Sequence, residues 1–251
     1  MGKVFKLKNI VSIFLFFILF SGLLESKDDK LQEARSLFLK GKYQEAINFC
    51  NLIETVDSFV LQSRIISIHT YFYKNGEQAE KEYLKAYNIA KQAIKNGNLN
   101  ADAYVEAAHA LGRYGQEIGI LHALSKGIAD RVKKYLTKAL SLHNENIIAN
   151  ISMGMWHAEV LNQAGRTIGK VVYGADIEKA RFFFAKAYEL NNQQIGLLYE
   201  LSYGYSLLGE EKDILRSNQL IEELFNIDNF SHMDSLYKKK ANKLKIELEK
   251  Y

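Results

Sequence analysis

The sequence predicts an all-α protein, a tetratricopeptide-like helical-repeat solenoid of about eleven helices with insertions within two helical pairs. Three observations support this prediction. The 251 residues include no proline, the residue that breaks helix interiors. Apolar side chains recur at helical spacing along the chain. Three segments resemble one another, and each holds a Lys-Ala step followed by a bulky residue: YLKAYNIA, YLTKALSLHN and FFAKAYELNN.

The N-terminus has the order of a secretory signal. Three lysines precede an apolar run from Ile10 to Leu24. At about 1.5 Å per residue this run would extend roughly 22 Å as a helix, less than the ~30 Å hydrocarbon core of a membrane. We therefore expect residues 1–26 to be a signal peptide, with an uncleaved anchor as the alternative. The predicted location is the periplasm or another exported site, with attachment to the inner membrane if the segment is kept.

The charge balance argues against a nucleic-acid binder. The formal net charge is +4, but residues 1–24 hold three of the 33 basic residues and none of the 29 acidic ones. The rest of the chain is therefore close to neutral, whereas nucleic-acid binding requires a basic surface. We expect no nucleic-acid partner, and contact with a membrane only through an uncleaved N-terminal segment.

The remaining residues are expected to form one helical-repeat domain. Its expected parts are generic repeats, inserted repeats and a charged capping helix, at 27–99, 100–230 and 231–251. In the first part Ala34, Gly41 and Ala46 have the spacings of a tetratricopeptide repeat. Small residues such as these and Ala187 let two helices approach closely. The single cysteine, Cys50, lies at helical spacing with Ala46 and is expected to pack in the core.

Two insertions lengthen the repeat. Lys138 and Lys186, at equivalent positions, are 48 residues apart, whereas a tetratricopeptide repeat has about 34 residues. The insertions are Gly115–Gly127 and Gly165–Gly174, and each joins the first helix of a pair to the second. They are therefore expected on the same edge of the stack, where insertions often build a binding face.

These inserted repeats resemble a known family. The segments GRYGQEIGILHALSKGIADRVKKYLTKALSL and GMWHAEVLNQAGRTIGKVVYGADIEKARFFFAKAYELNN are similar to the regulator-of-microtubule-dynamics proteins. They also resemble bacterial relatives, including the periplasmic T-component associated with TRAP transporters. The resemblance covers roughly residues 100–247. It implies a non-enzymatic helical-repeat protein, and the T-component resemblance implies a hydrophobic ligand.

The segment Ile147–Ala164 contains a His-x-Glu sequence that could suggest a catalytic or metal site. On a helix this segment has two apolar stripes, as expected for an inner helix packed between neighbours. His157 and Glu159 lie about 200° apart on such a helix, because residues i and i+2 do not face each other. The pair is therefore not a site, and His157 is expected to be a hydrogen-bonded core histidine.

Candidate groove residues come from two helices and the two insertions. Glu159 shares a narrow polar seam with Ser152 and Gln163. The helix Ala101–Glu117 carries a polar stripe of Glu106, His109, Arg113 and Glu117, which is more commonly a solvated face, with a groove wall as the alternative. Trp156 and the insertion residues His122 and Tyr173 complete the set. The candidates for groove or ligand binding are Glu106, His109, Arg113, His122, Ser152, Trp156, Glu159, Gln163 and Tyr173.

The sequence favours an exported, non-enzymatic scaffold that binds a protein or peptide partner in its concave groove. The alternative is a periplasmic binding protein for a small apolar or amphipathic ligand, associated with a transporter. A groove lined by tyrosine and charge would favour the first, and a closed cavity lined by Trp156, Val171, Val172 and Tyr173 the second. No catalytic residue, metal ligand or cofactor is predicted, because nucleotide-binding, CxxC and nucleophile-elbow motifs are absent.

Overall fold

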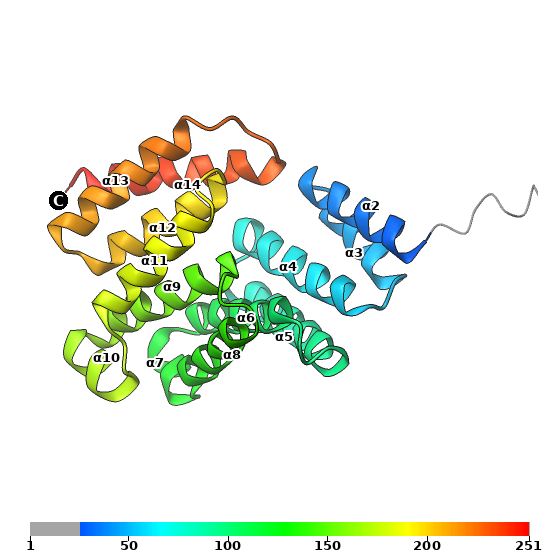
Figure 1. The fold of residues 1–251 in the computed structure, drawn as a ribbon, viewed down its shortest axis with the longest axis horizontal. Coiled ribbons are helices and arrows are strands. Elements are labelled where there is room, and N and C mark those ends of the chain that lie inside the picture. Colours follow the sequence, from blue (N-terminus) through cyan, green and yellow to red (C-terminus); the bar gives the residue numbers. More distant parts are fainter. Residues whose placement is uncertain (1–25, 251) are drawn as a thin grey trace, which may run out of the picture.

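The computed structural model describes residues 26–250, apart from the side chains of residues 120 and 121. These residues form thirteen helices and no strand (Figure 1), which confirms the all-α prediction. The predicted signal peptide, except for its last residue, lies outside the described residues. In chain order the helices are α2 (Lys27–Leu39), α3 (Tyr43–Asn51), α4 (Val56–Tyr73), α5 (Gly76–Asn96), α6 (Ala101–Glu117), α7 (Ile120–Ser125), α8 (Ile128–Leu142), α9 (Ile147–Ala164), α10 (Arg166–Tyr173), α11 (Ile177–Leu190), α12 (Ile195–Leu208), α13 (Glu211–Phe225) and α14 (His232–Leu248).

Ten of these helices form five consecutive pairs. The pairs are α2/α3, α4/α5, α6/α8, α9/α11 and α12/α13, and the first helices of neighbouring pairs also contact one another. The first helices thus form one layer of a solenoid, as predicted. The short helices α7 and α10 lie in the two predicted insertions, which accounts for thirteen described helices where about eleven were expected.

Asparagine caps repeat at the starts of two inner helices. The Asn100 and Asn146 side chains each accept the backbone N–H three residues later, at 3.0 and 2.9 Å. These bonds satisfy donors that a helix start otherwise leaves without a partner. Each asparagine also donates to the first-turn aspartate of the preceding inner helix, Asp57 or Asp102. The caps therefore set the register between neighbouring repeats.

Small residues allow the close helix contacts that the sequence predicted. Ala34, Ala46 and Ala187 are all fully buried, and Cys50 is also in the core. In the fourth pair the ring of Phe184 packs against Gly154, where an added Cβ would lie 2.5 Å from the ring. A small residue is thus a steric requirement at these positions, and they fix the distance between helices.

Both insertions end in the same backbone conformation. Gly127 precedes α8 with φ of 63°, and Gly174 ends α10 with φ of 66°. This left-handed region is accessible to glycine at little energetic cost, so each glycine lets the chain turn sharply into the second helix of its pair. The two short helices lie along the same lower edge of the stack in Figure 1, as predicted.

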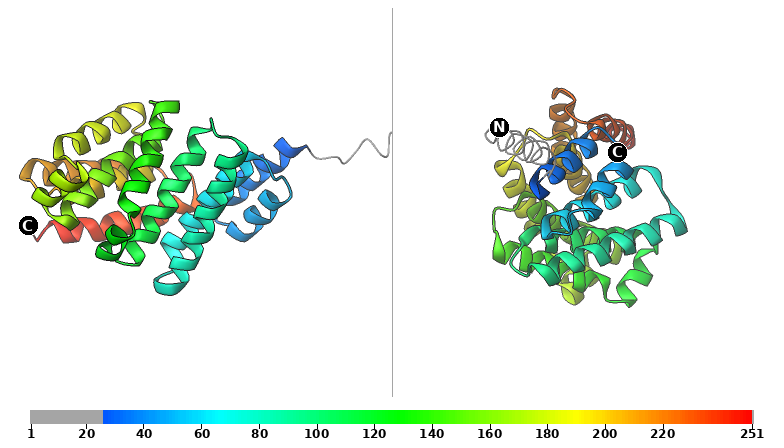
Figure 2. Two further views of the ribbon diagram at one scale, coloured as in Figure 1. Left: turned by 90° about the horizontal axis from the view of Figure 1, so that it is seen from below. Right: turned by 90° about the vertical axis from the view of Figure 1, so that its right-hand side faces the viewer.

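The last helix, α14, reaches back to the start of the domain. It packs against α12 and α13, as a terminal capping helix should, and it runs along the long axis of the stack, across the direction of the paired helices (Figure 2). Its first residue, His232, forms a hydrogen bond of 3.0 Å with the hydroxyl of Tyr73 on α4. Tyr237 packs edge-on against Phe72, with ring centroids 5.0 Å apart. The helix therefore links the two ends of the solenoid across its inner face.

Candidate functional site

The inner helices enclose a cavity of about 630 Å³. Its wall comes from α4, α6, α8, α9 and α12, with further residues from α2, α7, α14 and the segment before α14. Within the described residues no three potential metal ligands lie close together, and no described helix has the length and apolar character needed to span a membrane. The cavity, where residues of several repeats meet, is the candidate site for binding a partner.

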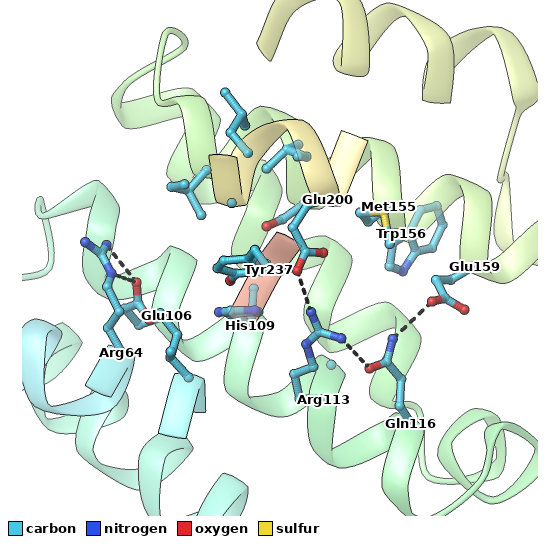
Figure 3. Close-up of a pocket in the computed structure, with 18 of the residues that line it drawn as sticks. Arg64, Glu106, His109, Arg113, Gln116, Met155, Trp156, Glu159, Glu200 and Tyr237 are labelled. Carbon is cyan, nitrogen blue, oxygen red and sulfur yellow. Dashed lines mark hydrogen bonds and ion pairs between the residues drawn. The ribbon is translucent and has the colours of Figure 1, made fainter. Parts of the chain in front are cut away.

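One face of α6 supplies the polar floor of the cavity (Figure 3). Glu106, His109, Arg113 and Gln116 follow one another at helical spacing, and all four line the cavity. The predicted stripe ended instead at Glu117, which is exposed and accepts a hydrogen bond from the backbone of Gly76. The first three residues of the predicted stripe are therefore placed correctly, and its last member is not.

Glu106 is buried against an arginine of the neighbouring helix. Its side chain is 1% exposed, and its Oε1 accepts from Nε of Arg64 at 2.8 Å. Burial raises the pKa of Glu106, and Arg64 partly offsets this effect. The common interpretation of this stripe as a solvated face is thus wrong at Glu106, because α4 packs over it and removes it from water.

Arg113 joins two further helices to α6. Its guanidinium donates to Glu200 on α12 at 3.1 Å and to Gln116 at 3.2 Å. The same group lies over the ring of Tyr71, 4.1 Å from its centroid. Only 12% of the Arg113 side chain and 19% of the Glu200 side chain are exposed. This ion pair is therefore largely shielded from water and holds α4, α6 and α12 around the cavity.

His109 lies between the two ion pairs as a neutral imidazole. Burial lowers its pKa to about 3, and the positive charges of Arg113 and Arg64 add to that shift. A group with so low a pKa does not bind a proton near neutral pH, so His109 is unsuited to general-base catalysis there. It can offer one donor and one acceptor to a ligand.

Glu159 lies at the other end of the α6 stripe. Its Oε1 accepts from Nε2 of Gln116 at 3.1 Å, and burial raises its pKa. Ser152 and Gln163, the other members of the predicted seam, also line the cavity. The seam on α9 therefore faces the α6 stripe across the cavity.

Trp156 and His157 are neighbours with different roles. Trp156 lines the cavity and is 5% exposed, and its Nε1 donates to the carbonyl of Ala129 at 2.9 Å. His157 is 3% exposed, and its Nδ1 accepts from the backbone N–H of Asp176 at 3.0 Å. Burial, with Lys133, lowers the pKa of His157 to about 4. The prediction of a hydrogen-bonded core histidine is confirmed.

The two insertion residues predicted for the groove, His122 and Tyr173, do not line the cavity, although Ala123 and Leu124 of the first insertion do. His122 is exposed, and the carbonyl of Tyr173 accepts from Nζ of Lys133 at 2.9 Å. Val171 and Val172 are 79% and 66% exposed, because the other face of α10 packs through Gly169 against α9. The structure therefore does not form the closed cavity of Trp156, Val171, Val172 and Tyr173 that would have favoured a small ligand.

Arg64, Glu200 and Tyr237 are among the cavity residues that were not predicted from the sequence. Arg64 and Glu200 each interrupt the apolar sequence of an inner helix, α4 or α12. A single charge within an apolar helix is costly unless it is paired, so this pattern was a signal that could have found both. Tyr237 gave no such signal, because its helix is highly charged and only the fold places it beside Gly196 of α12.

Comparison with known proteins places the chain among helical-repeat proteins. The model of the family described as Regulator of microtubule dynamics protein 1-3 matches residues 30–249. No curated protein matches the chain.

Two solved structures match the chain. TTC0263, a thermophilic TPR protein of Thermus thermophilus, has a TM-score of 0.62 at 12% identity, covering 86% of this chain and 98% of that one. YrrB, described as a TPR protein with an unusual peptide-binding site, has a TM-score of 0.40 at 14% identity, covering 90% of this chain and 97% of that one. The first of these supports the tetratricopeptide-like fold.

Proposed function

We propose that this chain, which belongs to the regulator of microtubule dynamics protein 1-3 family, is an exported, non-enzymatic scaffold that binds a protein partner in its concave cavity. The observation that carries the proposal is the cavity of about 630 Å³ enclosed by the inner helices. Tyr237 and the pairs Arg64–Glu106 and Arg113–Glu200 line it, and a groove lined by tyrosine and charge suits a polypeptide partner.

The non-enzymatic part of the proposal rests on the chemistry of the same wall. The charged groups of Arg64, Glu106, Arg113 and Glu200 are held in ion pairs, and His109 is neutral near pH 7. The ion pairs account for these charged groups without assigning any of them a catalytic role. Positioned charges of this kind orient a partner and give specificity.

Export is proposed from the N-terminal segment. Three lysines followed by an apolar run have the order of a signal peptide. The family name describes a role on microtubules. An exported protein would not meet microtubules, so we do not propose that role for this chain. Fractionation of cells that express the full-length chain tests this part, and retention in the cytoplasm without membrane association would contradict it.

A cavity-filling variant tests partner binding. Ser152 lies on the cavity wall, whereas Asn162 is exposed on the same helix outside it. We expect Ser152→Trp to abolish partner binding and Asn162→Trp to preserve it, with both variants melting within a few degrees of wild type. Equal binding by both variants would contradict a partner site in the cavity.

A small amphipathic ligand is the second candidate function. The cavity volume of about 630 Å³ falls within the usual range for small-molecule sites, about 300–1,000 Å³, and α14 closes one side of it. Native mass spectrometry of protein purified from its source separates the candidates. A bound species below about 1 kDa would favour this candidate over a protein partner.

A further inference from the structure

The cavity wall has more acidic than basic side chains. The charged residues that line it are two arginines and five carboxylates: Arg64, Arg113, Glu106, Glu159, Glu200, Asp228 and Asp234. Arg64 pairs with Glu106, and Arg113 pairs with Glu200. The other three carboxylates have no cation within salt-bridge distance among the described residues. The wall therefore retains negative charge after its own ion pairs have formed.

Of these three carboxylates, Asp228 is exposed and Glu159 and Asp234 are half-buried. Only Glu159 belongs to the hydrogen-bond network of the α6 stripe. A neutral amide, Gln116, donates to its Oε1, and that amide in turn accepts from Arg113. Asp234 differs, since the backbone N–H groups of Phe230 and Ser231 already satisfy its Oδ2 as a helix cap. Glu159 thus faces the cavity with a partly desolvated carboxylate and no cation of its own.

Glu106 shows the same excess of acceptors at the opposite end of the stripe. Both contacts from Arg64 go to Oε1, and Oε2 is buried without a hydrogen-bond partner. A buried acceptor without a donor is costly, and such groups in native proteins require an explanation. A ligand that brings donors to this wall would improve its hydrogen bonding.

Apolar side chains flank Glu159 on its own helix, beside its polar contact with Gln116 of α6. Four apolar residues of α9 line the cavity near Glu159: Ile151, Met155, Trp156 and Val160. A lysine-like group has this complementary form, because its methylene stem packs on apolar surface while its ammonium group seeks a carboxylate. A bare inorganic cation would leave this apolar wall unused.

We propose that the cavity selects a ligand with an ammonium or guanidinium group on an apolar stem, and that Glu159 pairs with the cation. This inference rests on the proposed function, because it names the chemistry that the partner inserts into the concave cavity. Two sources could supply that chemistry, a lysine or arginine side chain of a protein partner and a free amphipathic amine. The ammonium group would donate to the carboxylate of Glu159, and the stem would lie along Met155 and Trp156.

Matched probes test the proposal on the purified protein. Isothermal titration calorimetry would compare decylamine with decan-1-ol, and the peptide acetyl-Ala-Leu-Lys-Leu-Ala-amide with its norleucine counterpart. A hydrogen bond to a charged group is expected to make at least one cationic probe bind about tenfold or more tightly than its neutral counterpart. If the preference for the cation is larger within the peptide pair, the source is a protein side chain. If it is larger between decylamine and decan-1-ol, the source is a free amine.

Two variants complete the experiment. Glu159→Gln is expected to remove the preference for the cationic probe while keeping the neutral probe's affinity. Glu189→Gln, an exposed position outside the cavity, should keep the preference. The proposal is overturned if no pair shows a preference, or if Glu159→Gln retains it. If neutral and cationic probes bind equally, cation selection is refuted. If Ser152→Trp also abolishes the binding of both, the cavity remains the binding site.

Discussion

The ion pair between Arg64 and Glu106 provides the sharpest test of how the cavity wall is held together. Both contacts from Arg64 go to one oxygen of a carboxylate that is 1% exposed, so Arg64→Met leaves a buried charge without a cation. Such losses typically cost about 3–5 kcal/mol of unfolding free energy. Because the Arg64 side chain is 30% exposed, water screens part of the pair, and we expect the lower end, about 3 kcal/mol.

Urea unfolding measures this cost, and a double variant reveals its cause. If the penalty comes from the stranded carboxylate, Arg64→Met combined with Glu106→Leu should recover most of the lost stability, since apolar replacements of buried ion pairs are often neutral. As a control, Lys81→Met breaks an exposed pair with Glu77 and should leave the unfolding free energy unchanged. The reasoning fails if the single and double variants lose the same amount.

The pH dependence of the single variant gives an independent check. Burial already raises the pKa of Glu106 in the wild type, and removing Arg64 raises it further. A folded-state pKa above the unfolded value means that the folded protein binds the proton more tightly. The variant's deficit should therefore shrink as the pH falls through that raised pKa. A deficit that grows on acidification would contradict the assignment.

Three further predictions follow from the packing and the charges. Ala187→Leu should cost about 1–3 kcal/mol in thermal melts, because Ala187 is fully buried, whereas Ala185→Leu on the exposed face of α11 should melt like wild type. Val171→Ser should change stability by less than about 0.5 kcal/mol, because Val171 is 79% exposed; a larger loss would mean that α10 packs differently. In NMR titrations the imidazole of His109, whose pKa is lowered to about 3, should show no protonation step between about pH 5 and 8, and a step there would mean that it is not shielded by burial.

The fold could be predicted because its determinants are local. The Lys-Ala segments, the fully buried alanines and the glycines of the two insertions act within one helical pair, and their spacing is visible in the sequence. The sandwiched position of α9 followed from its two apolar stripes. His157 could be assigned to the core for the same reason, and the structure confirms that assignment.

The cavity could be predicted only in part, because its charge pairs join different repeats. Arg64 and Glu106 are 42 residues apart, and Arg113 and Glu200 are 87 apart. Helical periodicity gives the face on which each residue lies, but the twist between repeats decides which faces meet. The end of the α6 stripe illustrates this limit. Residues i+3 and i+4 after Arg113 share its face, and only the contact with Glu159 selects Gln116.

The position of α14 lay further beyond the sequence. Its charges suggested a solvated cap, yet His232 contacts Tyr73 across 159 residues of chain. Such contacts depend on the curvature of the whole stack, which no single repeat reveals. The side of the cavity that this helix closes was therefore not predicted.

Site-specific photo-crosslinking tests the central claim most directly, namely that a partner binds inside the concave cavity. A benzoylphenylalanine residue would replace Ser152, on the cavity wall, or Asn162, exposed on the same helix outside it. Irradiation of cells that express the full-length chain should crosslink a partner from position 152 and not from position 162. Crosslinking from position 162 alone would place the partner on the outer surface and contradict the account.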